Sequence, residues 1–103
     1  MGEVWRVKKQ EIVTLLREHV AELRKFGVRR LALFGSVLRD QAGEGSDIDV
    51  LVELAPKTFD NYMGLKFFLE RLLGRRVDLV LLDALKPLLK PRILKEAEFV
   101  EGL

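Results

Sequence analysis

The stretch that most constrains the fold of this chain is residues 31–54, in which two apolar runs flank a segment rich in turn-forming residues. The second run contains Asp47 and Asp49, although strands normally exclude aspartate because a carboxylate loses hydration on a half-buried sheet surface. Alternation along a strand places both carboxylates on one face and the aliphatic residues between them on the other. The sequence therefore predicts a sheet that presents two carboxylates on one face.

Two carboxylates held side by side repel each other, so a proton or a cation has to neutralise them. Ligands that offer only oxygen favour a hard cation, Mg²⁺ or Mn²⁺. The alternative is that Asp47 belongs to a turn and Asp49 faces solvent at a sheet edge, which is the more common structure for an isolated Asp-x-Asp. The residues before and after this strand bear on that choice.

Upstream, residues 28–34 predict a buried strand that turns sharply at Gly35-Ser36 into a short helical start over 37–39. A small residue lets backbone N–H groups approach a phosphate, and Ser36 adds a hydroxyl donor at a helix N-terminus. The same dipeptide is also an ordinary turn and helix cap. Arg39 lies one helical turn after Ser36, where it either contacts a terminal phosphate or is a solvated surface residue.

Downstream, residues 77–82 predict a third strand that contains Asp78. If this strand lies beside the second, Asp78 completes a carboxylate cluster with Asp47 and Asp49. Asp83 is expected to cap the last segment, 84–100, as a helix in which prolines set the start or a bend.

Helical periodicity predicts an amphipathic helix over 7–26 and another over 58–73, capped by Thr58 and ended by Gly74. The aromatic residues of the second helix are expected in the core. His19 lies beside the apolar stripe of the first helix, where a lone histidine is more often packed than a base. The alternation of helices and strands predicts an α/β (α+β) fold, a small mixed β-sheet flanked by helices.

Composition narrows the function. The 103 residues are expected to form one domain, 1–103, without a membrane span, and a cytoplasmic location follows from that expectation. Cysteine is absent and there is one histidine, which excludes thiolate and multi-histidine metal sites. The formal charge of +2 does not require a nucleic-acid partner. Carboxylates opposite a phosphate-binding turn suit in-line displacement at phosphorus, with two metal ions about 3.5–4 Å apart.

The segments Phe34-Gly35-Ser36, Arg39, Ser46-Asp47-Ile48-Asp49-Val50 and Val77-Asp78-Leu79-Val80 together resemble the DNA polymerase β-type nucleotidyltransferase superfamily in its minimal form. The resemblance implies a polymerase β palm-like fold and transfer of a nucleoside monophosphate, AMP from ATP, to a hydroxyl. It implies that Asp47, Asp49 and Asp78 are catalytic metal ligands. It also implies that Gly35, Ser36, Arg39 and Ser46 bind the nucleotide.

Many minimal members of this superfamily pair with a helical HEPN-domain partner in toxin-antitoxin modules. The resemblance therefore implies a HEPN-type partner whose tyrosine accepts AMP. In one respect the chain departs from the family, because Asp40 stands where a glycine usually follows the arginine. This adds negative charge near the expected triphosphate site.

Two other functions stay open. The chain could neutralise a helical partner by docking, with nucleotide in a structural role only. It could also modify a small molecule or a nucleic acid, but a chain of 103 residues has little room for an acceptor domain and would need to form an oligomer.

Overall fold

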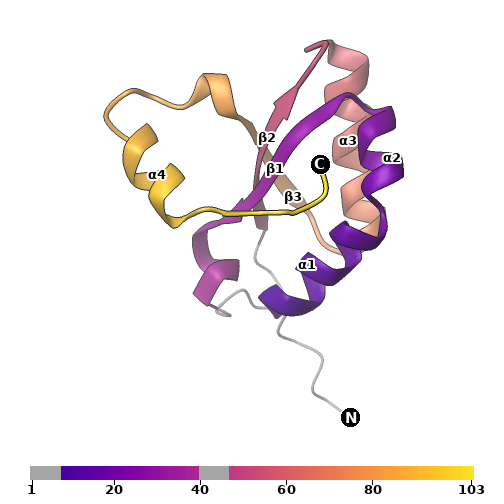
Figure 1. Ribbon diagram of the computed structural model, residues 1–103, viewed down its shortest axis with the longest axis horizontal. Coiled ribbons are helices and arrows are strands. Elements are labelled where there is room, and N and C mark those ends of the chain that lie inside the picture. Colours follow the sequence, from indigo (N-terminus) through magenta and orange to yellow (C-terminus); the bar gives the residue numbers. More distant parts are fainter. Residues whose placement is uncertain (1–7, 40–46) are drawn as a thin grey trace.

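The computed structural model describes residues 8–39 and 47–103, whose helices and strands are drawn in Figure 1. In chain order the elements are α1 (Lys9–Glu18), α2 (Val20–Lys25), β1 (Val28–Phe34), the 3-10 turn η1 (Gly35–Arg39), β2 (Ile48–Leu54), α3 (Phe59–Leu73), β3 (Val77–Leu81), the 3-10 turn η2 (Leu82–Ala84), α4 (Lys90–Glu96) and β4 (Glu98–Phe99). The three predicted strands are confirmed, each within a residue of its expected bounds.

The strands form one mixed sheet in the order β3-β2-β1-β4. β1 runs antiparallel to both β2 and β4, whereas β2 and β3 are parallel and are connected through α3. Parallel neighbours need a crossover connection of this kind, because a hairpin can join only antiparallel strands. The predicted mixed sheet flanked by helices is therefore confirmed.

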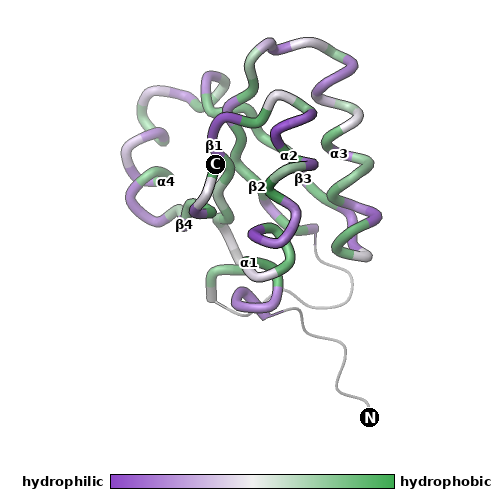
Figure 2. The backbone as a smooth tube through the Cα atoms, turned by 45° about the vertical axis from the view of Figure 1, so that its right-hand side comes forward, coloured by the Kyte–Doolittle hydropathy of each residue, from purple (hydrophilic) through white to green (hydrophobic). Residues whose placement is uncertain are grey.

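The two faces of the sheet are covered unequally. Helices α1, α2 and α3 cover one face, and α4 with its preceding loop lies on the other side (Figure 1). The larger core packs between the sheet and the three helices, and the smaller one lies beneath α4 and η2. In Figure 2 the central strands carry mostly hydrophobic residues, whereas hydrophobic and hydrophilic residues alternate along the helices. No helix in the described ranges is long and apolar enough to cross a lipid bilayer.

The first helix differs from the prediction of one helix over 7–26. It is interrupted at His19, whose N–H donates to Leu16 O at 3.1 Å and whose Nδ1 lies 2.8 Å from Leu15 O. The break lets Leu16 in α1 and Leu23 in α2 both be fully buried. His19 also contacts the Phe68 ring edge-on, so its predicted role as a packed residue is confirmed.

The bounds of α3 agree with the prediction, but its buried face does not. Thr58 Oγ1 accepts a hydrogen bond from Asn61 N at 3.1 Å, and Gly74 ends the helix with φ +67°. The expectation that all the aromatic residues of this helix lie in the core is wrong, because Phe59 is 77% exposed and Phe67 is 54% exposed. Leu65, Leu69 and their helical neighbours supply the packed stripe instead.

The last segment is also corrected. Asp83 does not cap a helix: it lies in η2, where its Oδ2 accepts from Lys57 Nζ at 2.6 Å. The helix is limited to α4, with Pro91 in its first turn, and the chain then continues as β4. β4 pairs with β1, Phe99 opposite Ala32 and Glu98 opposite Leu33, because the outer edge of β1 otherwise has backbone groups without partners.

Candidate active site

Two carboxylates meet where the parallel strands β2 and β3 begin. Asp49 and Asp78 are directly paired in the register of these strands. They share the face of the sheet that also carries Leu51 and Val80, which pack in the smaller core under α4. When Asp49 is protonated, its carboxyl can donate a hydrogen bond to Asp78. The prediction that Asp78 would lie beside the second strand, on the same face as Asp49, is confirmed.

This pairing changes the acidity of Asp49. Burial raises the pKa of the Asp49 carboxyl, and the negative charges of Asp78 and Asp47 and the hydrogen bond to Asp78 raise the pKa further. Desolvation and neighbouring like charges both disfavour the ionised form. The site therefore carries electrostatic repulsion that a proton or a cation would relieve.

Gly35 brings the backbone directly against this carboxylate. Its φ is +79°, and a Cβ built on it would lie 2.2 Å from Asp49 Oδ2, far closer than any side chain can approach. Gly35 also begins η1, which follows β1 at the same edge of the sheet. The site thus requires glycine here for two reasons: the left-handed backbone and the space that the carboxylate occupies.

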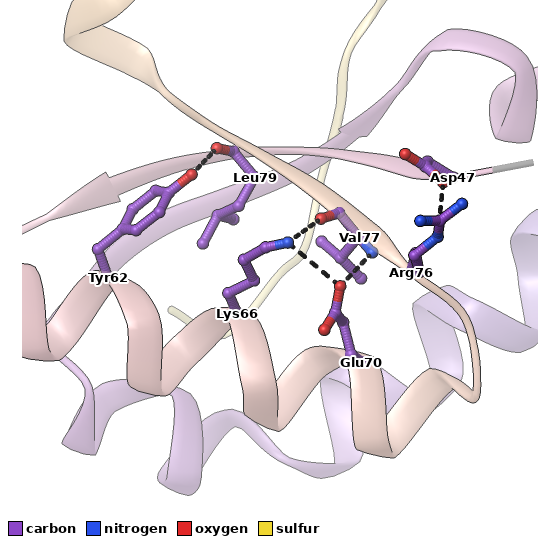
Figure 3. Close-up of polar contacts among 7 residues, drawn as sticks. All are labelled: Asp47, Tyr62, Lys66, Glu70, Arg76, Val77 and Leu79. Atoms are coloured by element: carbon purple, nitrogen blue, oxygen red, sulfur yellow. Dashed lines mark hydrogen bonds and ion pairs between the residues drawn. The ribbon is translucent and has the colours of Figure 1, made fainter.

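Asp47 lies just before β2 and faces a basic side chain. Arg76 Nε is 3.7 Å from Asp47 Oδ1, and the side chains are 85% and 50% exposed (Figure 3). The backbone brings them together, because Ile48 N donates to Arg76 O at 2.9 Å where the two strands begin. Arg76 was not among the predicted site residues. The signal that could have indicated it is a pair of arginines directly before a strand that contains an aspartate.

The donor atoms are of the kind that a hard divalent cation prefers, since they are carboxylate oxygens whose mutual repulsion a cation would relieve. Within residues 8–39 and 47–103, however, no three Asp, Glu or His side chains are grouped closely enough to hold a metal ion by themselves. Asp49 and Asp78 form a pair, and Asp47 is engaged by Arg76. The assignment of all three aspartates as metal ligands stays a prediction.

The predicted phosphate-binding residues are described only in part. The backbone of Ser36 and Arg39 lies in η1, directly after Gly35. Their side chains, and all of Ser46 and Asp40, lie outside the described structure. Their roles in nucleotide binding stay predictions.

An apolar pocket of about 470 Å³ lies at the other end of β2 and β3. Its walls come from the last residues of these strands, the first turn of α3 and η2, and include Leu54, Phe59, Tyr62 and Leu81. Because the strands are parallel, this end is opposite to the one that carries Asp49 and Asp78. The pocket is therefore separate from the candidate active site.

Comparison with known proteins finds a match to the family described as "Nucleotidyltransferase domain" over residues 13–100. The protein adenylyltransferase MntA of Thermococcus cleftensis is 41% identical over 93 residues, which cover 88% of this chain and 94% of that protein. A solved structure assigned as a minimal nucleotidyltransferase has a TM-score of 0.79 and 34% identity, and covers 94% of this chain and 98% of that one.

A third similar structure shares the fold at lower identity. It is the MNT antitoxin in complex with a tri-AMPylated HEPN toxin of Shewanella oneidensis. The TM-score is 0.61 at 23% identity, over 88% of this chain and 73% of that chain.

Proposed function

This chain belongs to the nucleotidyltransferase family, and we propose that it transfers AMP from ATP to a hydroxyl group of a partner protein. The observation that carries the proposal is the Asp49–Asp78 pair, held against the Gly35 turn on one face of the sheet. Aspartates on adjacent strands, beside a glycine turn that brings the backbone close to them, suit the binding of a metal-complexed triphosphate. The adenylyl specificity is supported by the similarity to a protein adenylyltransferase.

Each candidate residue has a role in this proposal. Asp47, Asp49 and Asp78 would hold the divalent cation, Mg²⁺ or Mn²⁺, as one or two ions. Gly35 and Ser36 offer backbone and hydroxyl donors to the phosphates, together with Arg39 and Ser46. When bound, the cation neutralises the carboxylates and the developing charge on the phosphate oxygens.

The reaction is a single displacement at the α-phosphorus of ATP. The acceptor oxygen forms a bond to the α-phosphorus while the bond from that phosphorus to the β,γ-pyrophosphate breaks, so pyrophosphate leaves and the hydroxyl loses its proton. Asp78 is exposed and lies opposite Asp49 in the strand register, which suits it to receive that proton and pass it to water. The products are an AMP ester of the partner, pyrophosphate and one proton.

The partner in this proposal is a helical protein of the HEPN type, with a tyrosine as acceptor. The MNT antitoxin of similar fold supports this choice, because its solved complex contains a HEPN toxin that carries AMP. The chain would then act as an antitoxin that inactivates its partner by modification. A cytoplasmic location is part of the same proposal.

The test is transfer of label from [α-³²P]ATP to a HEPN-type protein encoded beside this chain, in Mg²⁺ and with mass spectrometry of the product. We expect one AMP adduct on a tyrosine, and a loss of at least about 1,000-fold in Asp49→Asn, the order expected when a charge-stabilising group is removed. Asp83→Asn is the matched control, because Asp83 is bound to Lys57 at the opposite end of β3. Transfer that survives in Asp49→Asn would contradict the proposal.

One observation favours a second candidate, in which the chain silences its partner by docking alone. The apolar pocket beside the exposed Phe59 lies away from the carboxylates and offers a contact surface independent of them. Under this hypothesis a variant with Asp47, Asp49 and Asp78 all changed to Asn still binds and inhibits the partner. Under the adenylyltransferase proposal the same variant binds without lasting inhibition.

A further inference from the structure

The outer edge of β3 is covered by side chains instead of by another strand. Among the strands of the described residues, β3 lies at the edge of the sheet, with β2 as its neighbour. Backbone groups alternate in direction along a parallel pair, and Arg76 O points towards β2, where it accepts from Ile48 N. The backbone groups of Val77 and Leu79 therefore point the other way, towards α3.

Three side chains of α3 meet these groups (Figure 3). Tyr62 Oη donates to Leu79 O at 2.6 Å, and Lys66 Nζ donates to Val77 O at 3.2 Å. Glu70 Oε2 accepts from Val77 N at 3.0 Å and also from Lys66 Nζ at 3.3 Å. The three residues are spaced by four along the helix and so lie on one face of it. We call Tyr62, Lys66 and Glu70 the edge clamp.

The edge clamp acts on the residue directly before Asp78. Glu70 holds the N–H of the peptide that joins Arg76 to Val77, and Lys66 holds the C=O of the peptide that joins Val77 to Asp78. The Val77 N–H is the main cause that lowers the pKa of Glu70, so this carboxylate stays ionised at neutral pH. Lys66 and Glu70 are only 29% and 25% exposed, which limits the competition of water for these bonds.

We propose that Lys66 and Glu70 are positioning residues for the candidate active site: by fixing both peptide groups of Val77 they hold Asp78 opposite Asp49. The proposal rests on the proposed function, since it assigns to the pair an effect on the same carboxylates. β2 sets the position of Asp78 from one side, and the edge clamp sets it from the other. A purely structural role would be limited to protecting the strand edge from other chains.

The test compares two pairs of variants of the full chain. Glu70→Met and Lys66→Met remove the bonds to Val77, whereas Glu70→Gln keeps an acceptor and Lys66→Arg keeps a donor. Binding of Mn²⁺ to the nucleotide-free protein is measured by electron paramagnetic resonance. In parallel, two-dimensional NMR follows hydrogen exchange of the Val77 amide and the nuclear Overhauser effects between Asp78 and β2. Thermal unfolding shows that each variant is folded.

We expect Glu70→Met and Lys66→Met to weaken Mn²⁺ binding about tenfold, within the range for changes to residues that orient metal ligands. Hydrogen exchange of the Val77 amide should accelerate, and the nuclear Overhauser effects between Asp78 and β2 should weaken. Glu70→Gln and Lys66→Arg should restore most of the affinity. Lys57→Met is the matched control, because it breaks an ion pair with Asp83 beyond the far end of β3 and should leave Mn²⁺ binding unchanged.

Several outcomes overturn the proposal. Unchanged Mn²⁺ affinity in both methionine variants, with faster exchange at Val77, would show that the edge clamp only protects the strand edge. An equal loss of Mn²⁺ affinity in Lys57→Met would show that reduced stability, and not the position of Asp78, weakens Mn²⁺ binding. If the unchanged protein binds no Mn²⁺ and transfers no AMP, the proposed function fails, and the NMR contacts between Asp78 and β2 still decide the positioning role. If Glu70→Met does not fold, Lys66→Met provides the same comparison.

Discussion

The two ends of β3 place aspartates in opposite electrostatic surroundings. Where the strand begins, Asp78 faces Asp49, and burial together with like charge raises the pKa of Asp49. Just beyond its end, Asp83 bonds to Lys57 at 2.6 Å, and this bond and the lysine charge lower the pKa of Asp83. Among the described side chains, the repulsion between Asp49 and Asp78 remains at one end, and Lys57 neutralises Asp83 at the other.

This contrast teaches that the residue type alone does not mark a functional site. Asp83 would have to give up its ion pair with Lys57 before it could bind another group. Asp49 and Asp78, in contrast, would be stabilised by the binding of a proton or a cation. The folded state tolerates the repulsion between Asp49 and Asp78, because burial of a large apolar core stabilises the strands that carry them. Carboxyl groups whose pKa is raised by burial and by like charges cluster at functional sites.

Among changes that keep all three aspartates, Gly35→Ala is expected to have the largest effect on the contrast between the two ends of β3. The new methyl group would meet Asp49 Oδ2, so Asp49 would have to move, and the left-handed backbone adds strain of about 1–2 kcal/mol. We expect AMP transfer to fall at least about 100-fold, as displacements near 1 Å do in active sites. Steady-state rates with labelled ATP check this.

Gly74→Ala is the matched control for Gly35→Ala. Gly74 has a similar φ of +67°, but nothing lies within 4 Å of an added Cβ. It should lose similar backbone stability and keep its activity. Equal losses of activity in the two variants would show that backbone strain, and not the contact with Asp49, accounts for the effect of Gly35→Ala.

The second prediction is that Asp49→Asn stabilises the metal-free protein while removing its activity. Cross-strand side-chain pairs contribute about 0.2–1 kcal/mol, and like charges directly opposite each other are destabilising. The free energy of unfolding should therefore rise by an amount of this order at neutral pH. Thermal unfolding in the presence of a chelator measures it. Added Mg²⁺ should narrow the difference, because the cation stabilises only the unchanged protein.

The pH dependence of this difference follows from the raised pKa of Asp49. Between the ordinary pKa of aspartate and the raised one, the folded protein binds more protons at Asp49 than the unfolded chain, so stability falls as the pH rises through this window. Below the window the penalty is absent, and above it the penalty is complete. Asp49→Asn should remove this slope. A difference between the two proteins that is constant from acid to neutral pH would contradict the prediction.

Asp83→Asn is expected to have the smallest effect on stability. It tests the other side of the comparison, the aspartate beyond the end of β3. Its ion pair with Lys57 is about half exposed on both sides, and exposed pairs contribute little. The lowered pKa of Asp83 means that its contribution is present at neutral pH and is lost as the pH falls through that lowered value. The free energy of unfolding of Asp83→Asn should therefore be slightly lower than that of the unchanged protein at neutral pH, and the difference should disappear in acid. This is opposite in sign to the effect of Asp49→Asn. AMP transfer should be unchanged.

The centre of the site could be predicted from the sequence because its signal is local. Asp49 and Asp78 interrupt apolar strands, and strand periodicity assigns each of them to a face of its own strand. That they share one face follows from the parallel pairing of β2 with β3. A glycine directly after a buried strand likewise indicates a turn. That Gly35 would lie against Asp49 could not be read from the sequence, since the contact depends on how β1 and β2 pair.

The residues whose surroundings the sequence did not predict are positioned by distant parts of the chain. Phe59 and Phe67 are apolar, but the packed stripe of α3 is set by the sheet beneath it, which leaves both exposed. β4 follows α4 without a glycine or proline as a signal, and it forms because β1 offers a free edge. Arg76 is one of many arginines in the sequence, and only the strand pairing brings it to Asp47.

The placement of both carboxylates on strands has an implication for how such proteins diversify. The ladder between β2 and β3 acts as a ruler, because neighbouring strands stay about 4.8 Å apart whatever the length of the connections between them. Insertions in the surrounding loops could therefore alter the choice of acceptor while the spacing of Asp49 and Asp78 stays constant. The reactive centre and the recognition surface can change independently of each other.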